Sequence, residues 1–197
     1  MLIPSDGEIR ALHEKYAPTP EAFELVHTHC RIVCEIAERL LGADPGLDAD
    51  LVRAGCLLHD IGVYRLYDER GRLDHTRYVR HGVLGHALLR SEGFAEVICR
   101  FCSCHTGMGL SRDDVQRQKL PLPVADYLAE SGEERLVMYA DKFHSKTEPP
   151  TFVSATTYAA RVRRFGEDKA AAFLSLREHF GTPDLVPFLS TYGHACV

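Results

Sequence analysis

Apolar residues in this chain recur every three or four positions, and this spacing restricts the possible fold more than any other feature. It is clearest over residues 20–41, between Pro20 and Gly42. Such spacing gives a helix one apolar face, whereas the period-two alternation that marks a half-buried strand is scarce. The sequence therefore predicts an all-α protein. The stripe over 20–41 consists of Phe23, Val26, Cys30, Val33, Ala37 and Leu40.

Capping residues and helix breakers divide the chain into segments. Ser5 with Glu8 has the spacing of a capping box, and Thr19 before Pro20 marks a second helix start. Only 47 residues follow Pro149-Pro150, so we expect one domain over 1–197, with a core at about 20–147 and a C-terminal helical extension at 151–197. Helices are expected over residues 5–16, 20–41, 48–60, 76–91, 94–105, 133–145, 154–165, 167–180 and 184–191, with a loop at 65–75 and room for two short helices within 110–132.

Composition narrows the classes of function. The formal net charge of −5 argues against a general nucleic-acid binder. The N-terminus lacks the basic and apolar regions of a secretory leader, and no apolar run reaches the length of a membrane span. Seven cysteines lie mostly within apolar helical patterns, which suits free thiols in a reducing compartment better than disulfides. We therefore expect a cytoplasmic protein with no membrane and no nucleic-acid partner.

Six His and Asp residues on or beside the apolar faces are the candidates for chemistry. The His59-Asp60 pair ends an apolar run, and Asp141 follows Met138-Tyr139-Ala140. Each alone fits a hydrogen-bonded core residue or a polar helix end. Five helices that each direct such a group inward are harder to explain without an ion, since a buried unpaired carboxylate is costly. The six residues are His29, His59, Asp60, His81, His105 and Asp141.

In this order and spacing, the motifs resemble the HD superfamily of metal-dependent phosphohydrolases, in the variant whose signature reads His-Asp-Ile-Gly. The resemblance covers about residues 20–147. It implies a bundle of about five core helices with metals at the centre, followed here by C-terminal helices. The matching motifs are His29 with Val33 and Ala37, Leu57-Leu58-His59-Asp60-Ile61-Gly62, His81-Gly82 with Gly85, His105-Thr106-Gly107 and Tyr139-Ala140-Asp141-Lys142.

The resemblance also implies a dinuclear centre in which Asp60 bridges two ions. Members with one metal have equivalents of four of the candidate residues, and members with two metals have two further histidines, which this chain also has. We expect two divalent transition metal ions, Fe or Mn first and Zn, Co or Ni as options, since ligands of this kind do not select one metal. One ion would be held by His29, His59, Asp60 and Asp141, and the other by Asp60, His81 and His105.

Two other histidines leave alternatives open. His86 lies little more than one helical turn from His81 and could replace it, although the glycine at 82 matches the motif and favours His81. His144 lies three residues after Asp141 and could support that ligand or face solvent. The cysteines before His105 superficially suggest zinc, but a structural zinc site usually needs a second ligand pair in a loop. We therefore assign His105 to the dinuclear centre.

Charge predicts the chemistry of such a centre. Two divalent ions and two carboxylates leave the site positive, which favours a bound hydroxide and an anionic substrate. Water between two metals loses a proton near neutral pH, and the hydroxide can attack phosphorus in line with the leaving group. The expected reaction is the hydrolysis of a phosphate ester or anhydride.

Basic residues near the motifs are the candidates for substrate contact. Family members often have Lys just after the signature, where this chain has Val63-Tyr64-Arg65, so Arg65 could take over that contact. Lys142 could contact the leaving group or pair with a neighbouring carboxylate. The other arginines between 65 and 80 suit phosphate binding, or they belong to a solvated loop balanced by acidic neighbours. The arginines at 161, 163 and 164 are expected on an exposed helix face.

The favoured function is a metal-dependent phosphohydrolase that acts on a small phosphorylated metabolite, with a nucleotide as the preferred class. Asp60, Lys142 and Arg65 are its expected catalytic residues. The alternative is a mixed-valent di-iron oxygenase acting on a small phosphonate or polyol, because certain relatives use the same ligands for that chemistry. A non-catalytic binding module is the third hypothesis. The oligomeric state, for which a homodimer is one option, is left open.

Overall fold

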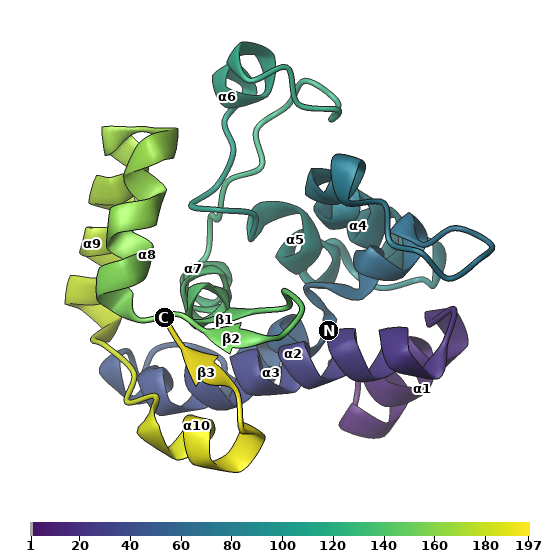
Figure 1. The fold of residues 1–197 in the computed structure, drawn as a ribbon, viewed down its shortest axis with the longest axis horizontal. Coiled ribbons are helices and arrows are strands. Elements are labelled where there is room, and N and C mark those ends of the chain that lie inside the picture. Colours follow the sequence, from purple (N-terminus) through teal and green to yellow (C-terminus); the bar gives the residue numbers. More distant parts are fainter. Residues whose placement is uncertain (1) are drawn as a thin grey trace.

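A computed structural model of the chain describes residues 2–197, and a bundle of helices forms its body (Figure 1). Helix α2 packs against α3 and α7, and α5 packs against α3, α4 and α7. This arrangement confirms the predicted all-α bundle of about five core helices. The core helices are α2 (Pro20–Leu40), α3 (Ala49–Leu58), α4 (His81–Ser91), α5 (Glu96–Cys104) and α7 (Gly132–Ala140), and α1 (Asp6–Tyr16) lies against α2 and α3.

The remaining helices lie around this bundle. Helices α8 (Ala155–Val162) and α9 (Glu167–Phe180) form one flank, and α10 (Val186–Tyr192) lies near the end of the chain (Figure 1). Helix α6 (Arg112–Arg117) belongs to an excursion between α5 and α7 that projects from the bundle (Figure 1). Within residues 2–197, every helix is too short or too polar to span a bilayer.

A small three-stranded sheet was not predicted. Strand β1 (His144–Ser145) pairs antiparallel with β2 (Thr151–Phe152), and β2 pairs parallel with β3 (Ala195–Cys196). The helix expected over 133–145 therefore ends at Ala140, continues as a 3-10 turn over Asp141–Phe143, and then becomes extended. The sheet brings the end of the chain beside the segment that follows Asp141.

The helix expected over 76–91 begins later than predicted. Residues His75–Arg80 form 3-10 turns that Asp74 caps, and Arg77 has the non-helical angles φ −109° and ψ 18°. The α-helix begins at His81, which places this histidine at the helix N-terminus. The expected loop at 65–75 is preceded by another 3-10 segment, η2 (Ile61–Leu66), which follows the His59-Asp60 pair directly.

The core is continuous through the bundle and contains most of the cysteines. All seven thiols are free, six are buried, and Cys196 is exposed. This agrees with the predicted free thiols. The largest side chains with almost no exposure include Ile36, Leu58, Phe101 and Tyr139.

Segment η2 packs so closely against α4 that Gly62 has no room for a side chain. A Cβ at Gly62 would lie 2.0 Å from the carbonyl oxygen of His81 and 2.3 Å from the backbone nitrogen of Gly85. Both neighbours are backbone atoms, so neither can rotate away. The glycine of the His-Asp-Ile-Gly sequence therefore determines how closely α4, with His81 at its start, approaches Asp60.

Substitution of Gly62 by Ala is expected to lower the free energy of unfolding by about 1–3 kcal/mol or more, as for other overpacked cores, because α4 must move away from η2. Gly42→Ala is the matched control, because a Cβ at Gly42 would meet no atom within 4 Å. Chemical denaturation of both variants measures the difference. Equal stabilities for the two variants would contradict this account of the close packing.

Candidate metal centre

The six His and Asp residues predicted as ligands come together at the centre of the bundle. Each core helix supplies at least one of these side chains. The residue from α2 lies in the middle of the helix, and the others lie at or just after a helix end. All six side chains are buried apart from that of Asp141, which is 15% exposed. The residues are His29 on α2, His59 and Asp60 after α3, His81 at the start of α4, His105 after α5 and Asp141 after α7.

His29, His59, Asp60 and Asp141 form the first group. The Nε2 atom of His29 lies 3.1 Å from Asp60 Oδ2 and 3.0 Å from Asp141 Oδ1. The Nε2 atom of His59 lies 3.4 Å and 3.5 Å from the same two oxygens. The two imidazole Nε2 atoms are 3.3 Å apart. Four potential ligand atoms therefore surround one small volume.

His81, His105 and the second oxygen of Asp60 form the other group. Asp60 Oδ1 lies 3.5 Å from His81 Nε2 and 3.5 Å from His105 Nε2. These two nitrogens are 2.9 Å apart. Within residues 2–197, Oδ1 is buried and accepts no hydrogen bond. The carboxylate of Asp60 thus presents one oxygen to each group, as a bridging ligand requires.

Hydrogen bonds orient the imidazole rings. A neutral imidazole has one N–H, so a ring whose Nδ1 donates presents a lone pair at Nε2. Three of the rings place Nδ1 against a backbone carbonyl, which can only accept. Their Nε2 atoms therefore converge beside the carboxylates. Asp60 and Asp141 raise the pKa of His59 well above its usual value despite burial, so the site favours a cation, either a proton on His59 or a metal ion. The pairs are His59 Nδ1 with Cys56 O at 2.7 Å, His81 Nδ1 with Tyr78 O at 2.6 Å, and His105 Nδ1 with Phe101 O at 3.0 Å.

His29 is oriented by other histidines. Its Nδ1 lies 2.9 Å from His144 Nδ1, and His144 Nε2 lies 3.0 Å from His194 Nδ1. Burial, together with the neighbouring His29 and His194, lowers the pKa of His144 to about 2, so His144 is neutral. If His29 donates from Nδ1, His144 accepts and then donates from Nε2 to His194. His144 therefore supports His29, whereas its sequence position suggested Asp141.

Two lysines pair with the carboxylates. Lys142 Nζ donates to Asp141 Oδ2 at 2.6 Å and to the carbonyl oxygen of His105 at 2.9 Å. Lys146 Nζ donates to Asp60 Oδ2. The role of Lys146 was not predicted, because it lies beyond the matching motifs in a segment without periodicity.

Both carboxylates are ionised. Burial alone raises the pKa of Asp60, but Lys146 and His59 hold it well below its usual range. Burial likewise opposes ionisation of Asp141, and Lys142 and His29 outweigh it. Imidazole nitrogens and ionised carboxylates are donors that divalent transition metals accept, so the residues fit the implied ions.

Arg65 and His86 do not join this cluster. The Arg65 guanidinium lies 4.9 Å from the ring centroid of Tyr16, and the residue lines a separate groove. His86 Nδ1 lies 3.0 Å from Ser103 Oγ. In the groove beside Arg65, Arg72 pairs with Asp68 at 2.7 Å and Arg77 with Asp74 at 2.6 Å, as expected for a loop balanced by acidic neighbours.

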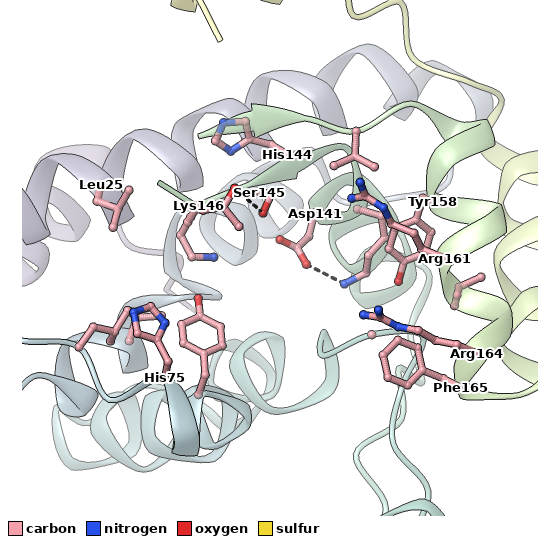
Figure 2. Close-up of a pocket in the computed structure, with 18 residues that line it drawn as sticks. Leu25, His75, Asp141, His144, Ser145, Lys146, Tyr158, Arg161, Arg164 and Phe165 are labelled. Carbon is pink, nitrogen blue, oxygen red and sulfur yellow. Dashed lines mark hydrogen bonds and ion pairs between the residues drawn. The ribbon is translucent and has the colours of Figure 1, made fainter. Parts of the chain in front are cut away.

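Two cavities open beside the cluster. A cavity of about 470 Å³ is lined by Lys142, Lys146 and residues of α8 (Figure 2). A second cavity of about 440 Å³ is lined by His81, His105 and part of the excursion between α5 and α7. Asp141 and Lys146 line both, so the candidate centre lies where the two cavities meet.

Sequence relatives match about 60% of the chain. The chain is 35% identical over 124 residues to a tRNA (cytidine(56)-2'-O)-methyltransferase of Picrophilus torridus, which covers 63% of this chain and 33% of that protein. It is 37% identical over 122 residues to an uncharacterized protein of Methanocaldococcus jannaschii, which covers 60% of this chain and 65% of that protein. The chain therefore matches about a third of the first relative and about two thirds of the second.

Solved structures share the fold. The HD domain of the L. monocytogenes phosphodiesterase PgpH has a TM-score of 0.55 and 17% identity, covering 94% of this chain and 99% of that chain. The same domain in complex with cyclic-di-AMP has a TM-score of 0.55, 15% identity, and coverage of 94% and 97%. The HD domain model matches residues 26–146. This chain is likewise a helical bundle, with a cluster of His and Asp residues at its centre. The chain belongs to the HD domain family, the metal-dependent phosphohydrolase superfamily that its motifs resemble.

Metal content tests the bridging geometry. Asp60→Ala is expected to lose both ions, because each group of ligands loses an oxygen, whereas His81→Ala is expected to retain only the ion held by the first group. Elemental analysis of the purified variants gives the number of ions per chain. His86→Ala is the control, because His86 bonds to Ser103 outside the cluster. Full metal content in Asp60→Ala would exclude the bridging role.

The support given by His144 is open to a separate test. His144→Ala is expected to weaken metal binding by about 10–100-fold, the usual effect of removing a partner of a ligand imidazole. Titration of the metal-free variant with a competing chelator measures the affinity, and excess metal should restore occupancy. An unchanged affinity would show that the orientation of His29 does not depend on His144.

Proposed function

We propose that this protein is a metal-dependent hydrolase that cleaves a phosphate ester or anhydride in a small nucleotide. The observation that carries the proposal is the position of Asp60, whose two oxygens face two separate pairs of imidazole nitrogens. Two ions held this way would act as Lewis acids on a phosphate and would lower the pKa of water.

The residues of the chain hold and orient the reacting groups. The four Nε2 atoms and two carboxylates would hold the ions, with Asp60 shared between the two groups of ligands. Lys142 and Lys146 line the cavity of about 470 Å³ beside the centre, where their ammonium groups can neutralise phosphate oxygens. In hydrolysis a water oxygen bonds to phosphorus, the bond to the leaving oxygen breaks, and a proton from water passes to the leaving group or to solvent. Lys142 is the proposed contact to that leaving oxygen.

A nucleotide is the proposed substrate class. The PgpH domain that shares this fold has been solved with cyclic-di-AMP, which supports a nucleotide but does not select one. The methyltransferase name of one relative describes a protein of which the match covers 33%. The cluster of imidazoles and carboxylates lies within the HD match over residues 26–146 and suits hydrolysis. Arg65 has no place in this proposal, because it lines a different groove.

The proposal is tested by a nucleotide hydrolysis panel run with and without oxygen. Metal-loaded protein is expected to release phosphate or nucleoside phosphate at equal rates in both conditions, because hydrolysis consumes only water. Asp60→Ala should lose at least about a hundredfold in kcat/KM, as expected when several kcal/mol of charge stabilisation is removed. His86→Ala should retain activity.

Two results would replace the proposal. Turnover of a phosphonate or polyol that requires oxygen and iron would identify the di-iron oxygenase. Full metal content with no turnover on the whole panel would identify a binding module.

A further inference from the structure

The cavity beside Lys142 is strongly cationic. Its lining includes two lysines that precede α8 and two arginines, one on α8 and one in the turn that follows. Among residues 2–197, Asp141 is its one carboxylate. The whole chain has a formal net charge of −5, so this concentration of positive charge is local. Two ions at the centre would add to it. The four cationic residues are Lys142, Lys146, Arg161 and Arg164.

The two arginines have no acidic partner within the described chain. Lys142 and Lys146 pair with Asp141 and Asp60, but neither Arg161 nor Arg164 forms an ion pair with a carboxylate of residues 2–197. Figure 2 shows both side chains extending from the α8 side along the cavity that contains Asp141. The guanidinium of Arg164 also lies over the ring of Phe165, 4.6 Å from its centroid. Planar guanidinium groups suit phosphate, because they can donate two parallel hydrogen bonds.

The second cavity is lined by neither Arg161 nor Arg164. Apolar side chains form much of its wall, together with His81, His105 and two lysines, Lys146 and Lys169. Such a wall suits the base and sugar of a nucleoside better than a second phosphate. The apolar residues are Val79, Met108, Leu110, Leu120, Val162 and Phe165.

These two cavities meet at the candidate centre, and this arrangement specifies a substrate class. We infer that Arg161 and Arg164 form a second phosphate-binding subsite, so that the preferred substrate is a nucleotide with at least two phosphate groups. The reacting phosphate would lie beside the ions that Asp60 and Asp141 would hold, the nucleoside in the second cavity, and the second phosphate on the arginines. This inference rests on the proposed function. Arg161 and Arg164 are exposed, as expected from the sequence, and they also line the cavity.

The first test compares substrates with one and two phosphates. The variant is Arg161→Gln with Arg164→Gln, and the substrates are the 5′-monophosphate, 5′-diphosphate and 5′-triphosphate of one nucleoside and a dinucleotide with the same base. We expect kcat/KM to fall by about 10–100-fold for substrates with a second phosphate, from the loss of charge-assisted hydrogen bonds, and to change less than about threefold for the monophosphate. The dinucleotide and the polyphosphates distinguish a bridging from a terminal second phosphate.

Arg163→Gln is the matched control. Arg163 lies between the two arginines in sequence, is exposed, and lines a separate apolar hollow with Ala159, Ala170 and Leu174. The control removes the same charge from the same helix end and should leave all rates unchanged. An equal loss in the control, or an equal loss for all substrates, would overturn the subsite.

A binding measurement separates this inference from the proposed function. Imidodiphosphate, which resists hydrolysis, should bind to metal-loaded protein by calorimetry, and the double variant should weaken that binding about tenfold or more while phosphate binding is unchanged. Unchanged imidodiphosphate binding would refute the subsite even if hydrolysis is observed. A protein that shows the binding difference but no hydrolysis would retain the subsite and lose the proposed function.

Discussion

Four imidazole lone pairs and two ionised carboxylates converge in the middle of a helical bundle, and the rest of the structure is arranged to make this possible. The facing imidazole nitrogens lie only 2.9–3.3 Å apart, which favours a cation between them. The backbone carbonyls behind His59, His81 and His105 fix which ring nitrogen faces inward. Lys142 and Lys146 then hold the carboxylates in their charged form.

The helices can bring these groups together only because they approach closely. Gly62 and Gly85 remove side chains where η2 crosses α4, so the first residue of α4 faces the pair at the end of α3. A 3-10 segment with a kink at Arg77 delays the start of α4 until His81. The chemistry of the centre therefore depends on backbone geometry at residues that never contact a ligand. The two cavities that meet at the centre have different linings, and we propose that this difference orients the substrate.

Sequence reasoning recovers the parts that repeat or match a motif. The apolar period predicted the core helices, and the ordered His and Asp residues predicted which side chains meet. It could not find the sheet, because two-residue strands carry no periodic signal and β2 pairs with residues more than forty positions later. It also missed Lys146 and the role of His144 and His194, which depend on that sheet. Arg65 was proposed from its position in sequence alone, and the backbone after Gly62 turns its side chain toward Tyr16.

The row of histidines from His29 through His144 to His194 links the metal centre to β3. Because β3 pairs with β2, His194 can reach His144 only when the last strand is docked. Thermodynamic linkage makes such a coupling reciprocal. An ion that orders His29 would also favour docking of the final strand, and undocking of this strand would lower the affinity for the ion. Docking of residues 194–196 and occupancy of the centre are therefore expected to change together.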